Sequence, residues 1–80
     1  MNFCIIDKQF LGDKTLRLKL KIKDEDLVYL GYIIEAYEGW CNYTTVKKPS
    51  GKFLQIDVVP DYIDNFMELL NLIESYNYEE

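Results

Sequence analysis

The 80-residue chain contains no histidine, only two cysteines and only four glycines. Without histidine it lacks the commonest general base and metal ligand. Cys4 and Cys41 are too few for a disulfide framework or a zinc site. The glycines stand singly, so no glycine-rich loop is present to cradle a phosphate. We therefore expect a protein that is not an enzyme, with no catalytic residue, metal or cofactor.

Long apolar runs are also absent. A membrane-spanning helix needs about 20 consecutive apolar residues, and no stretch of the sequence approaches that length. The opening MNFCIIDKQF lacks the basic start of a signal peptide. Hydrophobic residues nevertheless make up 49% and aromatics 15% of the chain. That apolar content excludes disorder. We expect a single cytoplasmic domain over residues 1–80, without a membrane partner and near the lower size limit for a self-sufficient core.

Charge is unevenly placed. The formal net charge is −5, which makes a nucleic-acid partner unexpected. Lys8 to Lys23 nevertheless holds six basic residues against one acid, whereas Asp61 to Glu80 holds six acids and no base. Opposite faces of the domain should therefore carry opposite fields.

Hydrophobic periodicity predicts three strands. TLRLKLKIK (15–23) alternates apolar and basic residues, which is typical of a strand with one buried face. WCNYTTVKK (40–48) is rich in strand formers. KFLQIDVV (52–59) places Leu54, Ile56 and Val58 on one face. Between the last two, Pro49 and Gly51 predict a turn with a positive φ at the glycine.

Two helices are predicted. DEDLVYLGYIIEAYEG (24–39) has Asp24 as its expected N-cap and Gly39 at the expected C′ position. Its apolar stripe is Leu27, Leu30, Ile33, Ile34 and Tyr37. PDYIDNFMELLNLIESY (60–76) has Asp61 as its expected N-cap. Its predicted buried stripe comprises Tyr62, Ile63, Phe66, Leu69, Leu70 and Ile73, with Asp64, Glu68, Asn71 and Ser75 opposite.

This order, β-α-β-β-α, predicts a ferredoxin-like α+β two-layer sandwich with both helices on one face of an antiparallel sheet. The last strand of that fold is missing. We expect residues 2–6 to fill its edge position through a hairpin over KQFLGDK, antiparallel to the first long strand.

Three surfaces are candidates for binding. On the open sheet face, Arg17, Lys19 and Lys21 are expected beside Phe53, an arrangement found in RNA-binding sheets. A solvated face that keeps the protein soluble is the interpretation we favour. On the outer side of the first helix, Val28, Tyr29 and Tyr32 form either a self-association interface or ordinary scattered exposure.

The third surface is the stretch Tyr37, Glu38, Gly39 and Trp40, where the first helix gives way to a strand. Trp40 is either a structural plug beneath the turn, with Glu38 or a carbonyl accepting its N–H, or one wall of a ligand site. We favour the plug.

The segments LRLKLKIKDEDLVYLGYIIEAYEG and LQIDVVPDYIDNFMELL, with Thr44 or Thr45 between them, resemble the small bacterial family called domain of unknown function 4911 over about residues 15–76. The resemblance assigns no activity. It implies a free-standing cytoplasmic protein whose fold is similar to ACT and other ferredoxin-like regulatory modules, which often dimerise and bind small metabolites between subunits.

We accordingly expect a non-enzymatic homodimer that binds a small metabolite near Tyr37, Glu38 and Trp40. Association would use a sheet edge or the Tyr29–Tyr32 side of the helix. The main alternative is a monomer that presents Arg17, Lys19, Lys21 and Phe53 to an acidic protein or to single-stranded RNA. A weaker third is an enzyme with Glu38 as base.

Overall fold

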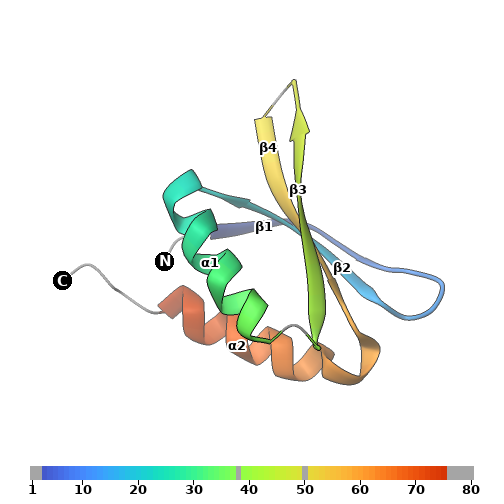
Figure 1. Ribbon diagram of the computed structural model, residues 1–80. Helices are drawn as coiled ribbons and strands as arrows, with labels where there is room; N and C mark the ends of the chain where they lie inside the picture. The colour runs from blue at the N-terminus through green and yellow to red at the C-terminus, as the bar shows by residue number, and fades with distance from the viewer. Residues whose placement is uncertain (1–2, 38, 50, 76–80) are drawn as a thin grey trace.

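The computed structural model describes residues 3–37, 39–49 and 51–75. The chain folds into a four-stranded antiparallel sheet with two helices on one face (Figure 1). The strands are β1 (Phe3–Phe10), β2 (Leu16–Ile22), β3 (Cys41–Lys48) and β4 (Gly51–Val58). The helices are α1 (Asp24–Ala36) and α2 (Ile63–Ser75), and the 3-10 turn η1 (Pro60–Tyr62) leads into α2.

The strand order β1-β2-β4-β3 confirms the predicted ferredoxin-like arrangement. β1 occupies the edge position beside β2 and pairs with it antiparallel, from Phe3 opposite Ile22 to Phe10 opposite Leu16. The strand is longer than predicted, because it continues through residues that we assigned to the hairpin turn. Its register shifts between Ile5 and Asp7, which marks a bulge.

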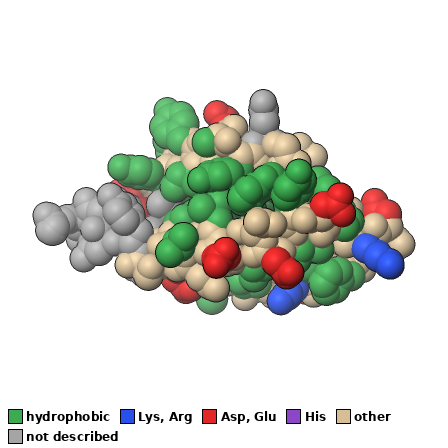
Figure 2. All heavy atoms as spheres, turned by 90° about the horizontal axis from the view of Figure 1, so that it is seen from below, with side chains coloured by type: hydrophobic (Ala, Val, Ile, Leu, Met, Phe, Trp, Pro, Cys, Tyr) green, Lys and Arg blue, Asp and Glu red, His purple; other side chains and the backbone are tan. Residues whose placement is uncertain are grey.

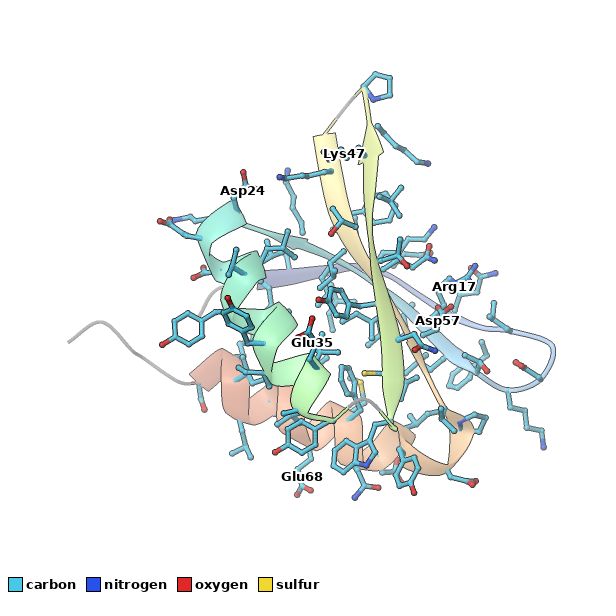
Figure 3. The ribbon with its side chains drawn as sticks, in the orientation of Figure 1. Arg17, Asp24, Glu35, Lys47, Asp57 and Glu68 are labelled. Carbon is cyan, nitrogen blue, oxygen red and sulfur yellow. The ribbon has the colours of Figure 1, made fainter. Side chains whose placement is uncertain are left out.

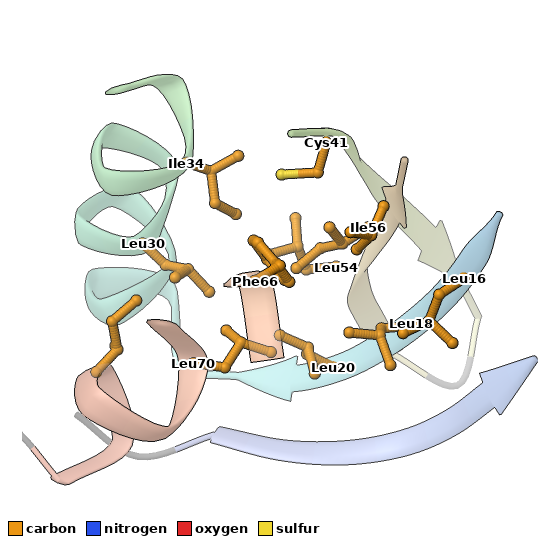
Figure 4. Close-up of a cluster of buried hydrophobic side chains, with 12 residues drawn as sticks. Leu16, Leu18, Leu20, Leu30, Ile34, Cys41, Leu54, Ile56, Phe66 and Leu70 are labelled. Atoms are coloured by element: carbon orange, nitrogen blue, oxygen red, sulfur yellow. The ribbon is translucent and has the colours of Figure 1, made fainter. Parts of the chain in front are cut away.

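The core lies between the sheet and the helices (Figure 4). The alternation predicted for β2 and β4 is confirmed, because their alternate apolar residues are fully buried and face α1 and α2. Phe66 of α2 lies at the centre of this cluster. Each such side chain contributes about 1.5–3 kcal/mol relative to an exposed one. The core set is Leu16, Leu18, Leu20, Leu30, Ile34, Cys41, Leu54, Ile56, Val58, Phe66, Leu70 and Ile73.

The predicted helix starts were each misplaced. α1 begins at Asp24 itself, with the extended Lys23 as N-cap and no side-chain cap. The Asp24 carboxylate instead pairs with Lys52 Nζ at 2.7 Å. Asp61 lies inside η1, where Pro60 takes the first position because its fixed φ suits a helical start. α2 therefore begins at Ile63, two residues after the expected N-cap Asp61.

Turn conformations agree only in part with the sequence. Gly51 adopts the predicted positive φ, at 134°, in the β3–β4 hairpin. The C-cap of α1 is Tyr37, so Gly39 lies two residues beyond the cap and not at C′. The left-handed residue of the β1–β2 loop is Lys14, with φ of 72°. Asp13 stabilises this loop, since its carboxylate accepts the Thr15 N–H at 3.0 Å and this bond lowers the pKa of Asp13.

Candidate functional site

The end of α1, the start of β3 and η1 bring three aromatic rings together, Tyr37, Trp40 and Tyr62, which we call the aromatic corner. Tyr37 N–H donates to the Ile34 carbonyl and closes the helix, and Trp40 N–H donates to the Tyr37 carbonyl, each at 2.9 Å. The Trp40 carbonyl accepts the Val59 N–H at 2.9 Å. These bonds hold Trp40 between α1 and the chain that enters η1.

Trp40 lies between the two tyrosines. Its ring centroid is 4.8 Å from that of Tyr37, with the planes tilted by 38°, and 5.6 Å from that of Tyr62, with the planes stacked at 12°. Both spacings are in the favourable range for aromatic pairs. Trp40 is half-buried against the core, whereas both tyrosines are exposed. Trp40 therefore has a buried side and a ring system that reaches the surface.

The sequence prediction for this region was incomplete. Glu38, the predicted acceptor and candidate base, lies outside the described residues. Tyr62 was assigned to the buried stripe of the last helix and is 39% exposed, because η1 rotates it out of the helical phase. Its pairing with Trp40 was missed. The signal available in the sequence was Pro60, which favours a separate first turn.

Hollows lined by described residues include two near opposite ends of the sheet, and neither of these two linings includes Tyr37, Trp40 or Tyr62. One, of about 220 Å³, lies between α1 and β3 and is lined by Ile34, Glu35, Cys41, Asn42 and Tyr43. The other, of about 430 Å³, is lined by Phe3, Cys4, Lys21, Ile22 and Lys23.

The outer face of α1 presents apolar side chains to solvent. Tyr32 is 70% exposed, Val28 58% and Tyr29 46%. Together with Glu25, these residues follow helical spacing and form one stripe, which we call the α1 outer face. Seen from below, hydrophobic side chains also gather across the helical layer, with acids near them (Figure 2). The predicted placement of Val28, Tyr29 and Tyr32 away from the core is confirmed.

The open sheet face carries cations, as predicted, but two of them, Arg17 and Lys19, are paired with acids. Arg17 donates from Nε to Asp57 Oδ1 at 2.8 Å and from Nη2 to Oδ2 at 3.0 Å (Figure 3). This hydrogen bonding raises the pKa of Arg17. Lys19 Nζ lies 3.8 Å from Asp7 Oδ2. Because acids from β4 and β1 neutralise these bases, the face is less basic than the β2 sequence alone suggests.

Phe53 lies at the centre of the remaining cations. Lys19 Nζ and Lys48 Nζ are over its ring, 5.6 and 5.8 Å from the centroid. Val46 is directly opposite Phe53 on β3, and Lys21 is one residue past Leu20, which pairs with Leu54. Phe53 and the lysines were expected on this face. The contribution of Lys48 from β3 was missed, because it depends on the register of the β3–β4 hairpin.

Reactive groups are few in the described part of the chain. Burial raises the pKa of the Cys41 thiol to about 11, so it stays protonated at neutral pH. A hydrogen bond from Tyr43 to Glu35, at 3.1 Å, raises the pKa of that tyrosine. Over residues 3–37, 39–49 and 51–75, no three His, Cys, Asp or Glu side chains gather to hold a metal ion. Neither α1 nor α2 is long and apolar enough to cross a membrane.

The sheet order and the one-sided helical layer define a ferredoxin-like α+β domain. Residues 20–76 match the family described as Domain of unknown function (DUF4911), and the chain belongs to that family. The match confirms the resemblance and begins at residue 20 instead of 15, so β1 and most of β2 precede it. Comparisons with curated proteins and with solved structures gave no match.

Proposed function

We propose that this protein is a small non-enzymatic module of the bacterial cytoplasm that self-associates through the α1 outer face. The observation that carries the proposal is the exposure of Tyr32 and Val28, at 70% and 58%, in the middle of a helix whose opposite side is already in the core. A helix with apolar residues on both sides is typical of one that is covered on both sides.

The size of the domain supports the same proposal. Small domains bury a limited fraction of their surface, and association with a further copy adds to that burial. Contiguous exposed apolar side chains of this kind mark interfaces more often than isolated ones do. Tyrosine suits such a position, because its ring packs while its hydroxyl remains hydrated.

The edge of β1 is the competing surface for self-association. It also exposes apolar residues, among them Phe10 at 62%. However, the bulge between Ile5 and Asp7 interrupts the edge, and Asp7 and Lys8 place charges on it. Bulges and charges are the features that discourage strand pairing between molecules. We therefore assign association to α1 and not to the sheet edge.

A small metabolite bound between subunits at the aromatic corner is the second part of the proposal, by analogy with ACT modules. Tyr37 directly follows α1, so a copy seated on the α1 outer face would come close to the corner. The Tyr37, Trp40 and Tyr62 rings offer a surface for an apolar group or for an ammonium group. An amino acid carries both, and it is the ligand class that we expect.

The non-enzymatic assignment rests on the chemistry of the groups present. The chain has no histidine. Cys41 is a buried, protonated thiol, and the exposed Cys4 is a free thiol on the edge strand β1. A thiol nucleophile requires a base or a positive environment that lowers its pKa. The pKa of Cys41 is shifted in the opposite direction.

A monomer that binds an acidic protein or single-stranded RNA on the open sheet face is the alternative. The cluster of Lys19, Lys21 and Lys48 around Phe53 favours it. Two observations count against it: Arg17 is neutralised by Asp57, and two ammonium groups already lie over the ring that a base would stack on. This alternative predicts loss of partner binding when Lys19 and Lys21 are changed to Glu.

Light scattering on purified variants tests self-association. We expect the unmodified chain to exceed monomer mass and Tyr32→Glu to approach monomer mass, because the new carboxylate would be buried in an apolar contact. Leu72→Glu on α2 is the matched control, since Leu72 is 65% exposed outside the α1 outer face, and it should retain the mass of the parent. A monomeric parent would refute the proposal and favour the alternative.

Trp40 fluorescence tests the ligand site, because it is the single tryptophan of the chain. Titration with amino acids should change its emission, and Tyr62→Ala should weaken binding by removing the stacked ring. Leu72→Ala, on α2 and outside the α1 outer face, is the control. Binding that is unaffected by Tyr62→Ala would place the ligand elsewhere.

A further inference from the structure

We propose that the α1 outer face of one copy docks on the open sheet face of the next copy, so that association is head-to-tail. The inference rests on the proposed self-association and names the surface that receives α1. It follows from two faces of this chain that match in length and differ in charge.

The helical layer is acidic. α1 contains Asp24, Glu25, the buried Asp26 and Glu35 and no basic residue, and α2, Ile63–Ser75, likewise contains only acids among its charged residues. Asp24 is paired with Lys52. Glu25 lies exposed one turn before Val28 and Tyr29, at one end of the α1 outer face. The face therefore has an apolar middle and an exposed acid, Glu25, at one end.

Symmetric pairing of two α1 helices would place acids near acids. With no Lys or Arg between Asp24 and Ala36, a second α1 brings only further acids. Like charges across an interface weaken association, and their alignment is one way in which proteins reject a partner. The favourable partner for α1 is a surface with an apolar centre and cations around it.

The open sheet face is such a surface. Its centre is the cross-strand pair of Val46 and Phe53, each half-buried. Lys21 and Lys48 lie beside that centre, and Lys19, which also pairs with Asp7, places its ammonium group over the Phe53 ring. Arg17 adds no free charge, because Asp57 binds it with two hydrogen bonds. This face is therefore apolar in the middle with lysines beside it, whereas the α1 outer face is apolar with Glu25 at one end.

The dimensions agree. α1 has 13 residues, and a helix of that size is about 20 Å long, at the usual rise for each residue. β3 and β4 have eight residues each, and such strands are about 26 Å long. One helix can therefore lie along the open face over these strands. Both α1 and α2 are on the opposite side of the sheet, so within the described residues no helix covers this face (Figure 1).

Head-to-tail contact has a different outcome from symmetric contact. Each copy has one α1 outer face and one open sheet face. In an open assembly, one end therefore exposes a free α1 outer face and the other end a free open sheet face. Such heterologous contacts form rings when the rotation closes and open chains when it does not. We expect masses above the dimer that increase with protein concentration.

Complementation between two variants tests the inference. The sheet-face variant, Lys21→Glu with Lys48→Glu, keeps the α1 outer face; Lys19 is left unchanged because it contacts Asp7. The helix-face variant, Tyr32→Glu, keeps the open sheet face. We expect each variant alone to be monomeric at the parent's assembly concentration. An equimolar mixture should form a heterodimer and nothing larger.

Matched controls separate docking from general charge and folding effects. Lys14→Glu with Lys47→Glu makes the same charge change, in the β1–β2 loop and on the helix side of β3 opposite Lys52, and should assemble like the parent. Circular dichroism and thermal unfolding establish that every variant folds. In the sheet-face variant, adding Glu25→Lys should increase the association constant by about tenfold, because the new lysine would face the two introduced glutamates.

The outcomes distinguish the two proposals. A parent that is monomeric overturns both. A sheet-face variant that assembles like the parent, while Tyr32→Glu does not assemble, leaves self-association intact and overturns head-to-tail docking. Two folded monomeric variants that stay monomeric when mixed also overturn it. A heterodimer in the mixture supports it.

Discussion

At the scale of single residues, Cys41 links burial to the pH dependence of stability. Its thiol is in the core, and burial raises its pKa to about 11. In the unfolded chain the thiol ionises near its ordinary pKa of 9.0. Between these values the unfolded state loses a proton that the native state keeps. The free energy of unfolding therefore falls as pH rises through this window.

We expect urea denaturation to show a loss of about 2 kcal/mol from this group between about pH 9 and pH 11. Cys41→Ala should not show this pH-dependent loss. The variant should be less stable than the parent at every pH, because alanine fills the core less well. Cys4→Ala, a change at an exposed thiol, should keep it. Equal slopes in Cys41→Ala and the parent would contradict the assignment.

Gly31 is a second residue whose surroundings predict a measurable effect. A Cβ at this position would lie 3.1 Å from Tyr43 Oη, which donates to Glu35. Alanine gains about 1 kcal/mol of helix propensity over glycine. In the parent this gain should be largely offset by displacement of the Tyr43 hydroxyl, so Gly31→Ala should be close to neutral.

In a Tyr43→Phe background the obstructing oxygen is absent, and Gly31→Ala should stabilise by about 1 kcal/mol. Chemical denaturation of the four proteins of this double-mutant cycle gives the coupling directly. Identical effects of Gly31→Ala in both backgrounds would show that the contact with Tyr43 has no energetic consequence.

At the scale of elements, α1 starts without a side-chain cap. Lys23 occupies the N-cap position with extended dihedral angles, φ −67° and ψ 152°, and its side chain makes no capping hydrogen bond. Those angles suit a serine, whose hydroxyl accepts a first-turn N–H. We expect Lys23→Ser to stabilise the protein by about 1 kcal/mol. Lys23→Ala, measured by the same thermal unfolding, should give no comparable gain.

The elements also show how far the sequence could predict the structure. The alternation of Leu16, Leu18 and Leu20 with basic residues correctly predicted β2, because one strand face must be buried. The missing last strand of the fold correctly predicted an N-terminal edge strand. Cap positions were wrong, because Asp24 had a tertiary partner in Lys52 that no local pattern reveals.

The candidate site was predicted less completely than the fold. The exposure of Val28 and Tyr32 followed from helical spacing alone. The Trp40–Tyr62 stack joins residues from different elements, and the 3-10 turn that produces it was read as part of a helix. Neutralisation of Arg17 required the β2–β4 register, which sets Asp57 opposite it.

At the scale of the whole molecule, the two faces differ in charge. Both helices carry acids and no base, whereas the open sheet face carries Lys21 and Lys48 beside the Arg17–Asp57 and Lys19–Asp7 ion pairs. Head-to-tail association aligns these faces, so it should be sensitive to ionic strength. Salt at about 0.1 M already screens exposed charges beyond about 10 Å.

We expect the mean mass from light scattering to fall between about 50 mM and about 500 mM NaCl, where the Debye length shortens several-fold. The sheet-face variant with added Glu25→Lys keeps opposite charges across the contact and should show the same trend. A mass that rises or stays constant with salt would indicate an interface held by apolar contact alone.

The aromatic corner of Tyr37, Trp40 and Tyr62 determines the fluorescence and the near-ultraviolet circular dichroism of the protein. Light absorbed by either tyrosine passes readily to an indole ring only a few ångströms away, so the two phenols emit little while the fold is intact. The closely spaced, tilted transition dipoles also give circular dichroism in the near ultraviolet. Because this is the single tryptophan of the chain, its emission reports on one place, where the first helix ends and the last one begins.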